Sequence, residues 1–407
     1  MTELDGGRSA WWDRVDQQKA MTLFLVALGG SYGLMVASML PSLVSAWVAH
    51  LGLTEKVAGE IATGNVLAAT VGLGLSVFLV RRASLPVIAR CGLALAVIGD
   101  LASIAASGAL DLGIYRIVAG LGLGLIAGAT TNWFGRHEQA ERGFGMYVML
   151  QFILTALLLV AIPLIEPVFG YASVYVALLS LALLTALLHP LLGLNGGSEP
   201  LKDIAGADVA AEQAGGHSTF MKLLSIFAFG LFNLAAIGLW SYMLRYGVLV
   251  GLSDEGASRA LALSSLCGIP GTVLVVALGN RYGRFRPLMI ALLLYALPIA
   301  LFARSNVSAW VFVGGLALQN VAWAVISPYF QAVQAALDRT GRLAVWGLFA
   351  ASAGAGIGPA LLGTAIDGTS YILAFGVALG ALVLSALLVV FPALATDWRD
   401  RDGAQPG

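Results

Sequence analysis

The feature that most constrains this chain is a series of long, weakly charged apolar runs that recurs along its whole length. Each run holds about 20 residues, long enough as a helix to cross about 30 Å of hydrocarbon. Each is continuously apolar and lacks the alternation of outer-membrane barrel strands. We count twelve, with centres near Tyr32, Ala68, Val97, Leu123, Ile153, Leu181, Phe232, Cys267, Leu293, Val321, Ala353 and Leu382. The chain is therefore predicted to be an all-α membrane protein with twelve transmembrane helices.

Composition supports this prediction and limits the chemistry of the chain. Hydrophobic residues make up 59% of its 407 residues and charged residues 11%, more apolar surface than a water-soluble fold can hide. The mixed charges of residues 1–19 before a long first span do not indicate a cleavable signal peptide. Cys91 and Cys267 fall inside predicted spans, and the four histidines are scattered. We expect no disulfide, metal site, cofactor or nucleic-acid partner.

The distribution of basic residues predicts the orientation. With twelve spans, seventeen of the 22 Lys and Arg residues lie in loops or tails on the side of the two termini. The opposite side holds Lys56, Arg245, Arg259 and Arg304, and Arg116 lies within a span. Because basic loops favour the cytoplasm, both termini are predicted to be cytoplasmic, in a multi-pass protein of the cell inner membrane.

The longest polar stretch divides the spans six and six. We predict an N-terminal bundle over residues 1–194, a cytoplasmic linker over 195–218, and a C-terminal bundle with a short tail over 219–407. Landmarks repeat across the linker at an offset of about 200 residues: basic residues at 81–82 and 281–286, and glycine-bearing segments at 141–145 and 341–347. This repeat predicts two pseudo-symmetric halves.

Two motifs make the chain similar to the major facilitator superfamily over almost its whole length. The stretch NRYGRFR resembles the family's loop signature between spans eight and nine, with Asn280 where the acid belongs, followed by Arg281, Gly283 and Arg284. In span four, Arg116 begins the R-x-x-x-G-x-G pattern that the family carries. The resemblance implies that the loop helps to latch the inward face and that the halves rock about a central site.

Glycines in two spans predict close helix packing. Gly120, Gly124 and Gly128 form a smooth stripe on span four, and no strand precedes them, so a dinucleotide loop is excluded. In span eleven, Gly358 and Pro359 combine close packing with a predicted hinge.

Arg116 is the sharpest functional candidate, because a charge inside a span is costly unless it is paired. Asp100 in span three lies at a similar depth and is the predicted partner. Two interpretations stay open: Arg116 binds a substrate anion or tunes a proton on Asp100, or the two form a static pair. Span one has no acidic residue, so proton coupling would use Asp100 or Glu60.

The resemblance implies a central cavity lined by spans one, four, seven and ten, with contributions from spans two, five, eight and eleven. Polar or aromatic residues near mid-depth are the candidate lining, although hydrogen bonding between helices is the alternative for each. They are Tyr32, Asn65, Gln151, Asn233, Trp240, Gln319, Asn320 and Trp323.

These observations predict a secondary transporter, expected to be a monomer, that moves a small organic solute by alternating access. Arg116 tilts the prediction toward an organic anion, with proton-coupled uptake. The alternatives are a drug/proton efflux antiporter, disfavoured because span five lacks the glycine-proline motif of such antiporters, and a non-transporting receptor on the same scaffold. An enzyme is excluded because no nucleophile with a base, paired catalytic carboxylates or metal cluster appears.

Overall fold

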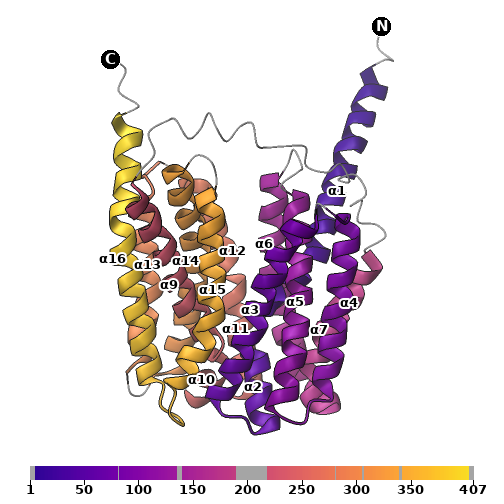
Figure 1. Cartoon of the computed structure of the whole chain (residues 1–407), viewed down its shortest axis with the longest axis vertical. Coiled ribbons are helices and arrows are strands. Elements are labelled where there is room, and N and C mark those ends of the chain that lie inside the picture. Colours follow the sequence, from indigo (N-terminus) through magenta and orange to yellow (C-terminus); the bar gives the residue numbers. More distant parts are fainter. Residues whose placement is uncertain are drawn as a thin grey trace.

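The computed structural model describes residues 5–80, 82–134, 140–188, 218–279, 281–304, 307–338 and 342–402. These ranges are almost entirely helical, and their isolated β-bridge joins Asp367 to Ser370. The helices stand side by side in two groups, one from each half of the chain (Figure 1). The predicted all-α architecture with two six-helix halves is confirmed.

In its described residues, the N-terminal half contains seven α-helices and one 3₁₀ helix. They are α1 (Asp5–Ser38), α2 (Leu40–Leu51), α3 (Glu55–Leu79), α4 (Leu85–Ile104), α5 (Ala109–Phe134), α6 (Ala140–Phe169), η1 (Gly170–Ala172) and α7 (Ser173–Leu188).

The C-terminal half contains eight helices in the described ranges. They are α9 (Thr219–Trp240), α10 (Met243–Leu249), α11 (Asp254–Leu266), α12 (Gly268–Leu278), α13 (Phe285–Phe302), α14 (Ala309–Leu337), α15 (Arg342–Thr364) and α16 (Ile372–Asp402). Of the predicted linker 195–218, only Ser218 is described, and its side chain accepts a hydrogen bond from the Phe220 backbone N–H.

Eleven segments of the described chain are long and apolar enough to cross a membrane. One of them, Met146–Leu188, is 43 residues long and contains most of α6 and all of α7, which pack against each other. Counted as two passes, this segment brings the total to the twelve that the sequence predicts. The eleven segments and the twelve predicted passes therefore differ only because this long segment is counted once.

The first pass of each half is broken at a corresponding place. The break between α1 and α2 lies at Met39, just before Pro41, which has no N–H to continue the helical ladder. The break between α9 and α10 lies at Ser241 and Tyr242. At the first break, the Ser38 carbonyl accepts a hydrogen bond from the Trp240 indole, 3.1 Å away. The two breaks thus bring the two halves into contact.

Close packing of α3 against α5 follows from the predicted glycine stripe. A Cβ atom at Gly120 would lie 2.1 Å from the Asn65 carbonyl oxygen, and one at Gly124 would lie 2.0 Å from the Ala69 carbonyl oxygen. Such distances exclude any side chain unless the backbones separate. The stripe is therefore a packing surface, as predicted, and it places Asn65 of α3 against Gly120, which lies one turn after Arg116 on α5.

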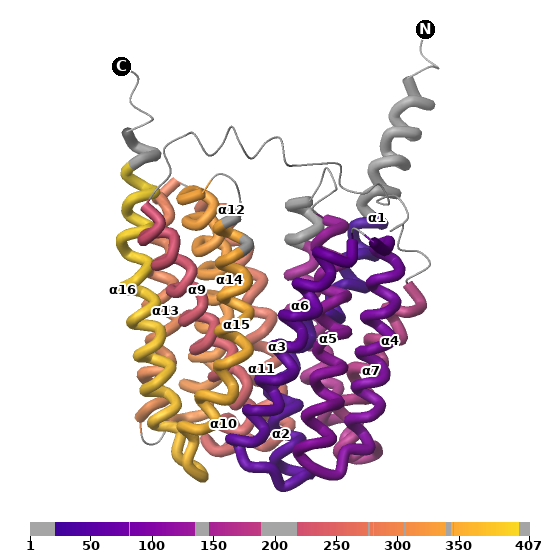
Figure 2. The backbone as a smooth tube through the Cα atoms, viewed as in Figure 1, coloured from indigo at the N-terminus to yellow at the C-terminus, as the bar shows by residue number. Residues whose placement is uncertain are grey.

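The two halves meet mainly through α3 with α15 and through α6 with α11. The single proton of the Tyr242 hydroxyl is shared between the Glu55 and Pro359 carbonyl oxygens, which lie 3.0 and 2.7 Å from the hydroxyl oxygen. Arg245 forms a 2.9 Å ion pair with Glu55. These contacts lie near α2 and α10, at the end of the molecule away from the two termini (Figure 2). The halves are thus joined at that end.

Candidate functional site

A charged pair lies in the interior of the N-terminal half. The Arg116 Nη1 atom of α5 is 2.5 Å from the Asp100 Oδ1 atom of α4, and both side chains are completely buried. Two isolated charges would be very costly here, whereas a paired arrangement offsets much of that desolvation. The pairing predicted from the depths of the two residues is confirmed; its role stays a prediction.

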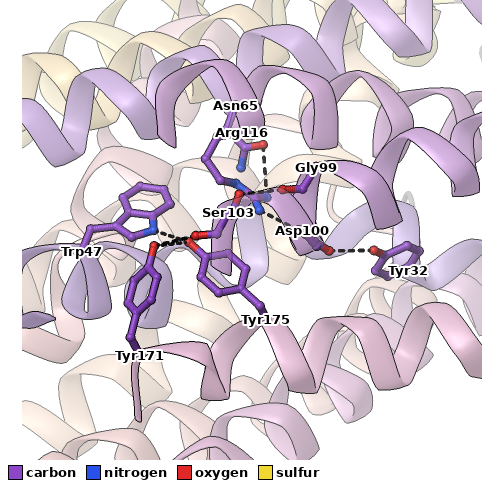
Figure 3. A network of polar contacts seen from close by, with 9 residues as sticks. All are labelled: Tyr32, Trp47, Asn65, Gly99, Asp100, Ser103, Arg116, Tyr171 and Tyr175. Atoms are coloured by element: carbon purple, nitrogen blue, oxygen red, sulfur yellow. Dashed lines mark hydrogen bonds and ion pairs between the residues drawn. The ribbon is translucent and has the colours of Figure 1, made fainter. Parts of the chain in front are cut away.

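Two further side chains form hydrogen bonds with the pair (Figure 3). The Tyr32 hydroxyl of α1 donates to the Asp100 Oδ2 atom at 2.9 Å, and the Arg116 Nη2 atom donates to the Asn65 Oδ1 atom of α3 at 3.5 Å. Both carboxylate oxygens therefore accept a hydrogen bond. The Arg116 Nε atom and the Asn65 amide nitrogen are buried without a hydrogen-bond partner in the described chain. Unused donors therefore remain beside the pair.

Aromatic side chains that the sequence did not single out lie on one side of the guanidinium. The Arg116 Cζ atom lies 5.8 Å from the centre of the Tyr175 ring, within reach of a cation–π interaction. The Tyr175 hydroxyl accepts from the Trp47 indole at 2.8 Å and pairs with the Tyr171 hydroxyl at 3.0 Å. The Tyr171 hydroxyl also donates to the Ser103 carbonyl oxygen. We call Tyr32, Trp47, Asn65, Asp100, Ser103, Arg116, Tyr171 and Tyr175 the Arg116 network.

A cavity lies between the two halves and is separate from the Arg116 network. Its volume is about 110 Å³. Five of the predicted lining residues border it: Gln151 from the N-terminal half, and Trp240, Gln319, Asn320 and Trp323 from the C-terminal half. The structure adds residues that the sequence did not single out, among them Ser38, Phe152, Thr155, Met243, Ser265 and Tyr295.

Hydrogen bonds orient several of the side chains in this lining. The Gln151 amide nitrogen donates to the Ser38 hydroxyl at 3.0 Å, and the Trp240 indole donates to the Ser38 carbonyl. The Asn320 amide nitrogen donates to the Leu316 carbonyl within its own helix at 3.0 Å. The break after α1 thus supplies both a hydroxyl and a carbonyl to the cavity wall.

The remaining candidate residues lie elsewhere in the described chain. Tyr32, Asn65 and Arg116 belong to the Arg116 network. Asn233 donates to the Phe229 carbonyl of its own helix, and Glu60 is exposed on α3. The substrate-binding and proton-coupling roles assigned to all these residues remain predictions. The rotation of each helix about its axis decides which of its residues face the cavity. Hydropathy along the sequence does not report this rotation.

The basic loop between spans eight and nine is held by an acid from another part of the chain. Asn280 lies outside the described residues, and Gly283 has a positive φ of 72°. The Arg284 backbone N–H donates to the Asp397 Oδ1 atom of α16 at 2.7 Å, and the Phe285 N–H donates to Oδ2 at 3.1 Å. The Arg281 backbone N–H bonds the Leu278 carbonyl. Asp397, which the motif did not indicate, caps the start of α13.

The predicted hinge lies where α15 packs against both halves. A Cβ atom at Gly358 would be 2.4 Å from the Leu234 carbonyl oxygen of α9. The Pro359 carbonyl accepts the Tyr242 hydroxyl, and the helix continues through Pro359 to Thr364. Tight packing at Gly358 is thus present, and hinge motion stays a prediction. Among the described residues, no group of His, Cys, Asp and Glu side chains is arranged to hold a metal ion.

No known family's sequence profile and no curated protein matches the chain. Solved structures do match over nearly the full length. A variant of the peptide transporter POT is 15% identical, with a TM-score of 0.72 over 93% of this chain and 94% of its own. The nucleoside transporter NupG is 15% identical, with a TM-score of 0.68 over 92% of this chain and 98% of its own. A D-xylose-proton symporter is 16% identical, with a TM-score of 0.69 over 93% and 96%. The chain therefore has the fold that these membrane transporters share, as its resemblance to the major facilitator superfamily predicted.

Proposed function

We propose that this protein is a secondary transporter that moves a small organic solute across the membrane by alternating access. The observation that carries this proposal is the cavity whose walls come from both halves, with Gln151 and Phe152 on one side and Trp240 and Trp323 on the other. A solute held between two bodies that rock against each other is released to one side or the other. The solved transporters of similar fold, a peptide transporter, a nucleoside transporter and a D-xylose-proton symporter, support this proposal.

The conformation supports the same proposal. The contacts of Glu55 with Tyr242 and Arg245 join the halves at the end away from the termini. If the termini are cytoplasmic, as the basic loops predict, this closed end is the outer one. The outward-facing state then requires these contacts to break, so they act as an outer latch.

We further propose that Asp100 carries a coupling proton during uptake. In the structure its carboxylate is balanced by the Arg116 guanidinium and by the Tyr32 hydroxyl. Protonation removes the ionic attraction and leaves Arg116 with an uncompensated charge, which favours a rearrangement of α4 against α5. An organic anion remains the second candidate substrate, because the Arg116 Nε atom has no hydrogen-bond partner in the described chain.

Proteoliposomes test the proposal. With a pH-sensitive dye inside, addition of a transported solute should drive proton entry, and radiolabelled solute should accumulate along an imposed pH gradient. Asp100→Asn should retain exchange of solute and lose gradient-driven accumulation, whereas the exposed Asp254→Asn should behave as the native protein. Proton movement opposite to the solute would indicate efflux by antiport. A folded protein that binds a solute and never moves it would be a receptor.

A further inference from the structure

The cavity between the halves has a lining without formal charge. Its polar groups are amides, hydroxyls and indoles, and no Asp, Glu, Lys, Arg or His side chain borders it among the described residues. Arg116, the charged residue for which the sequence predicts substrate binding, does not border the cavity and is completely buried and paired with Asp100. A charged solute in this cavity would lose its hydration without gaining an opposite charge, which is costly at such a depth.

Aromatic rings form much of the wall. Phe152 of α6 and Trp323 of α14 meet across the two halves, with ring centres 6.0 Å apart and planes at 90°. Trp240 and Tyr295 border the same space. Rings at these positions offer flat apolar faces to a solute, and they hold few rotamers compared with aliphatic chains of similar area. The wall therefore fits a solute that has a ring.

Two polar groups in this lining are buried without a hydrogen-bond partner in the described chain: the Trp323 indole nitrogen and the Thr155 hydroxyl. Such groups are rare in native interiors, and each one calls for a missing partner. An indole N–H can only donate, so its partner must be an acceptor. A hydroxyl can donate or accept. The two lie on opposite halves, on α14 and α6, so one solute that satisfies both would join the halves.

We infer that the cavity binds an uncharged, ring-bearing solute with a hydrogen-bond acceptor for the Trp323 indole and a polar group for Thr155. This inference rests on the proposed function and narrows it to a class of substrate. The amides of Gln151, Gln319 and Asn320 add donors and acceptors that suit a polar neutral molecule and give no net charge to attract an ion.

Pairs of solutes that share a ring and differ in charge test the inference, and the pair of nearly equal size, nicotinamide with nicotinate, separates charge from bulk. Nicotinamide with nicotinate, and uridine with uridine 5′-monophosphate, each keep the ring and change the charge. Binding to the purified protein is followed by thermal stabilisation and by calorimetry, because a ligand raises the unfolding temperature by mass action. At least one neutral member should bind, and its charged counterpart should bind at least tenfold more weakly.

A pair of tryptophan variants on one helix tests the contact. Trp323→Phe keeps a ring and removes the N–H, so it should weaken binding of the neutral solute about three- to tenfold. Trp310→Phe is the matched control, because Trp310 is 85% exposed at the start of α14. It should leave binding unchanged. Equal binding by both variants would overturn the role given to the indole.

The outcomes separate this inference from the proposed function. Stronger binding of a charged member than of its neutral partner overturns the inference, even if that ion is transported. Failure of every neutral member to bind also overturns it. Binding of a neutral member that is never carried across proteoliposomes supports the inference about the site and contradicts transport.

Discussion

The two halves place different chemistry at corresponding positions. Tyr371 and Phe375 stand 200 positions after Tyr171 and Tyr175. In the N-terminal half, the two tyrosine rings lie 5.4 Å apart, and Tyr175 faces the Arg116 guanidinium. In the C-terminal half, the corresponding rings lie 6.1 Å apart and pack among other rings. We call Tyr246, Phe302, Phe312, Tyr371 and Phe375 the C-terminal aromatic cluster.

The comparison bears on why the charged pair exists. In the C-terminal half, the region that corresponds to the Arg116 network is filled by the rings of the aromatic cluster. Its Tyr246 hydroxyl donates to the Phe302 carbonyl at 2.8 Å. Packed apolar groups often stabilise a core as well as a buried ion pair does, or better. Stability alone therefore does not require Arg116 and Asp100. This reasoning supports a functional role for the pair, and five sets of variants can break or sharpen the comparison.

The largest effect is expected for Arg116→Ala. The substitution leaves the Asp100 carboxylate buried with the Tyr32 hydroxyl as its remaining donor in the described chain, so the free energy of unfolding should fall by about 3–5 kcal/mol. Chemical unfolding in detergent measures this. Arg259→Ala, which removes an exposed partner of Glu255, is the control and should change stability by at most about 0.5 kcal/mol.

A double substitution separates stability from function in the same place. Arg116→Met with Asp100→Leu removes both charges, as in the aromatic cluster, and should recover most of the lost stability. Transport should stay absent. Normal gradient-driven accumulation by the double variant would show that the pair is static, and it would remove the functional difference between the halves.

Tyr175→Phe removes the hydroxyl group that Phe375, the corresponding residue of the C-terminal half, also lacks. The Trp47 indole loses its acceptor and becomes a buried unpaired donor, so the protein should lose about 1–3 kcal/mol of stability. The exposed Tyr282→Phe is the control. An unchanged unfolding midpoint for Tyr175→Phe would mean that the hydroxyl contributes nothing to the Arg116 network.

Phe375→Leu tests whether the aromatic cluster is only structural. The change keeps most of the side-chain volume, so stability should fall by about 1 kcal/mol. Transport per folded molecule and the ratio of protons to solute should not change, because no charged group of the Arg116 network is touched. A changed ratio would show that the C-terminal half takes part in coupling.

Arg245→Gln tests the latch next to the aromatic cluster. Loss of the partly buried ion pair with Glu55 should shift the balance toward the outward-facing state by about 1 kcal/mol, or roughly fivefold. Spin labels at Lys56→Cys and Thr364→Cys, in a protein without its native cysteines, report the opening as a longer distance. Arg259→Gln is the control. An unchanged distance distribution would exclude a latch role for this ion pair.

Part of the site could be predicted because the cost of burying a charge in hydrocarbon can be read from a single residue inside a span. A charge at Arg116 needs a partner, and Asp100 was the acid at the same depth on a neighbouring helix. Asp397 and Tyr175 could not be found in this way. Asp397 lies more than one hundred positions after Arg284, and Tyr175 looks like any aromatic residue of a span. Their roles depend on which helices are neighbours and on how each is rotated.

The sequence by itself determined the all-helical fold, the passes, the two halves and the close packing at Gly120 and Gly124, because hydropathy and residue size act wherever a helix meets lipid or another helix. Only the tertiary structure decided that Gln151, Trp240 and Trp323 share one cavity while Arg116 and Tyr32 lie in a separate network. The physical reason is that the rotation of each helix about its axis follows from the packing of all its neighbours together, which no single segment encodes.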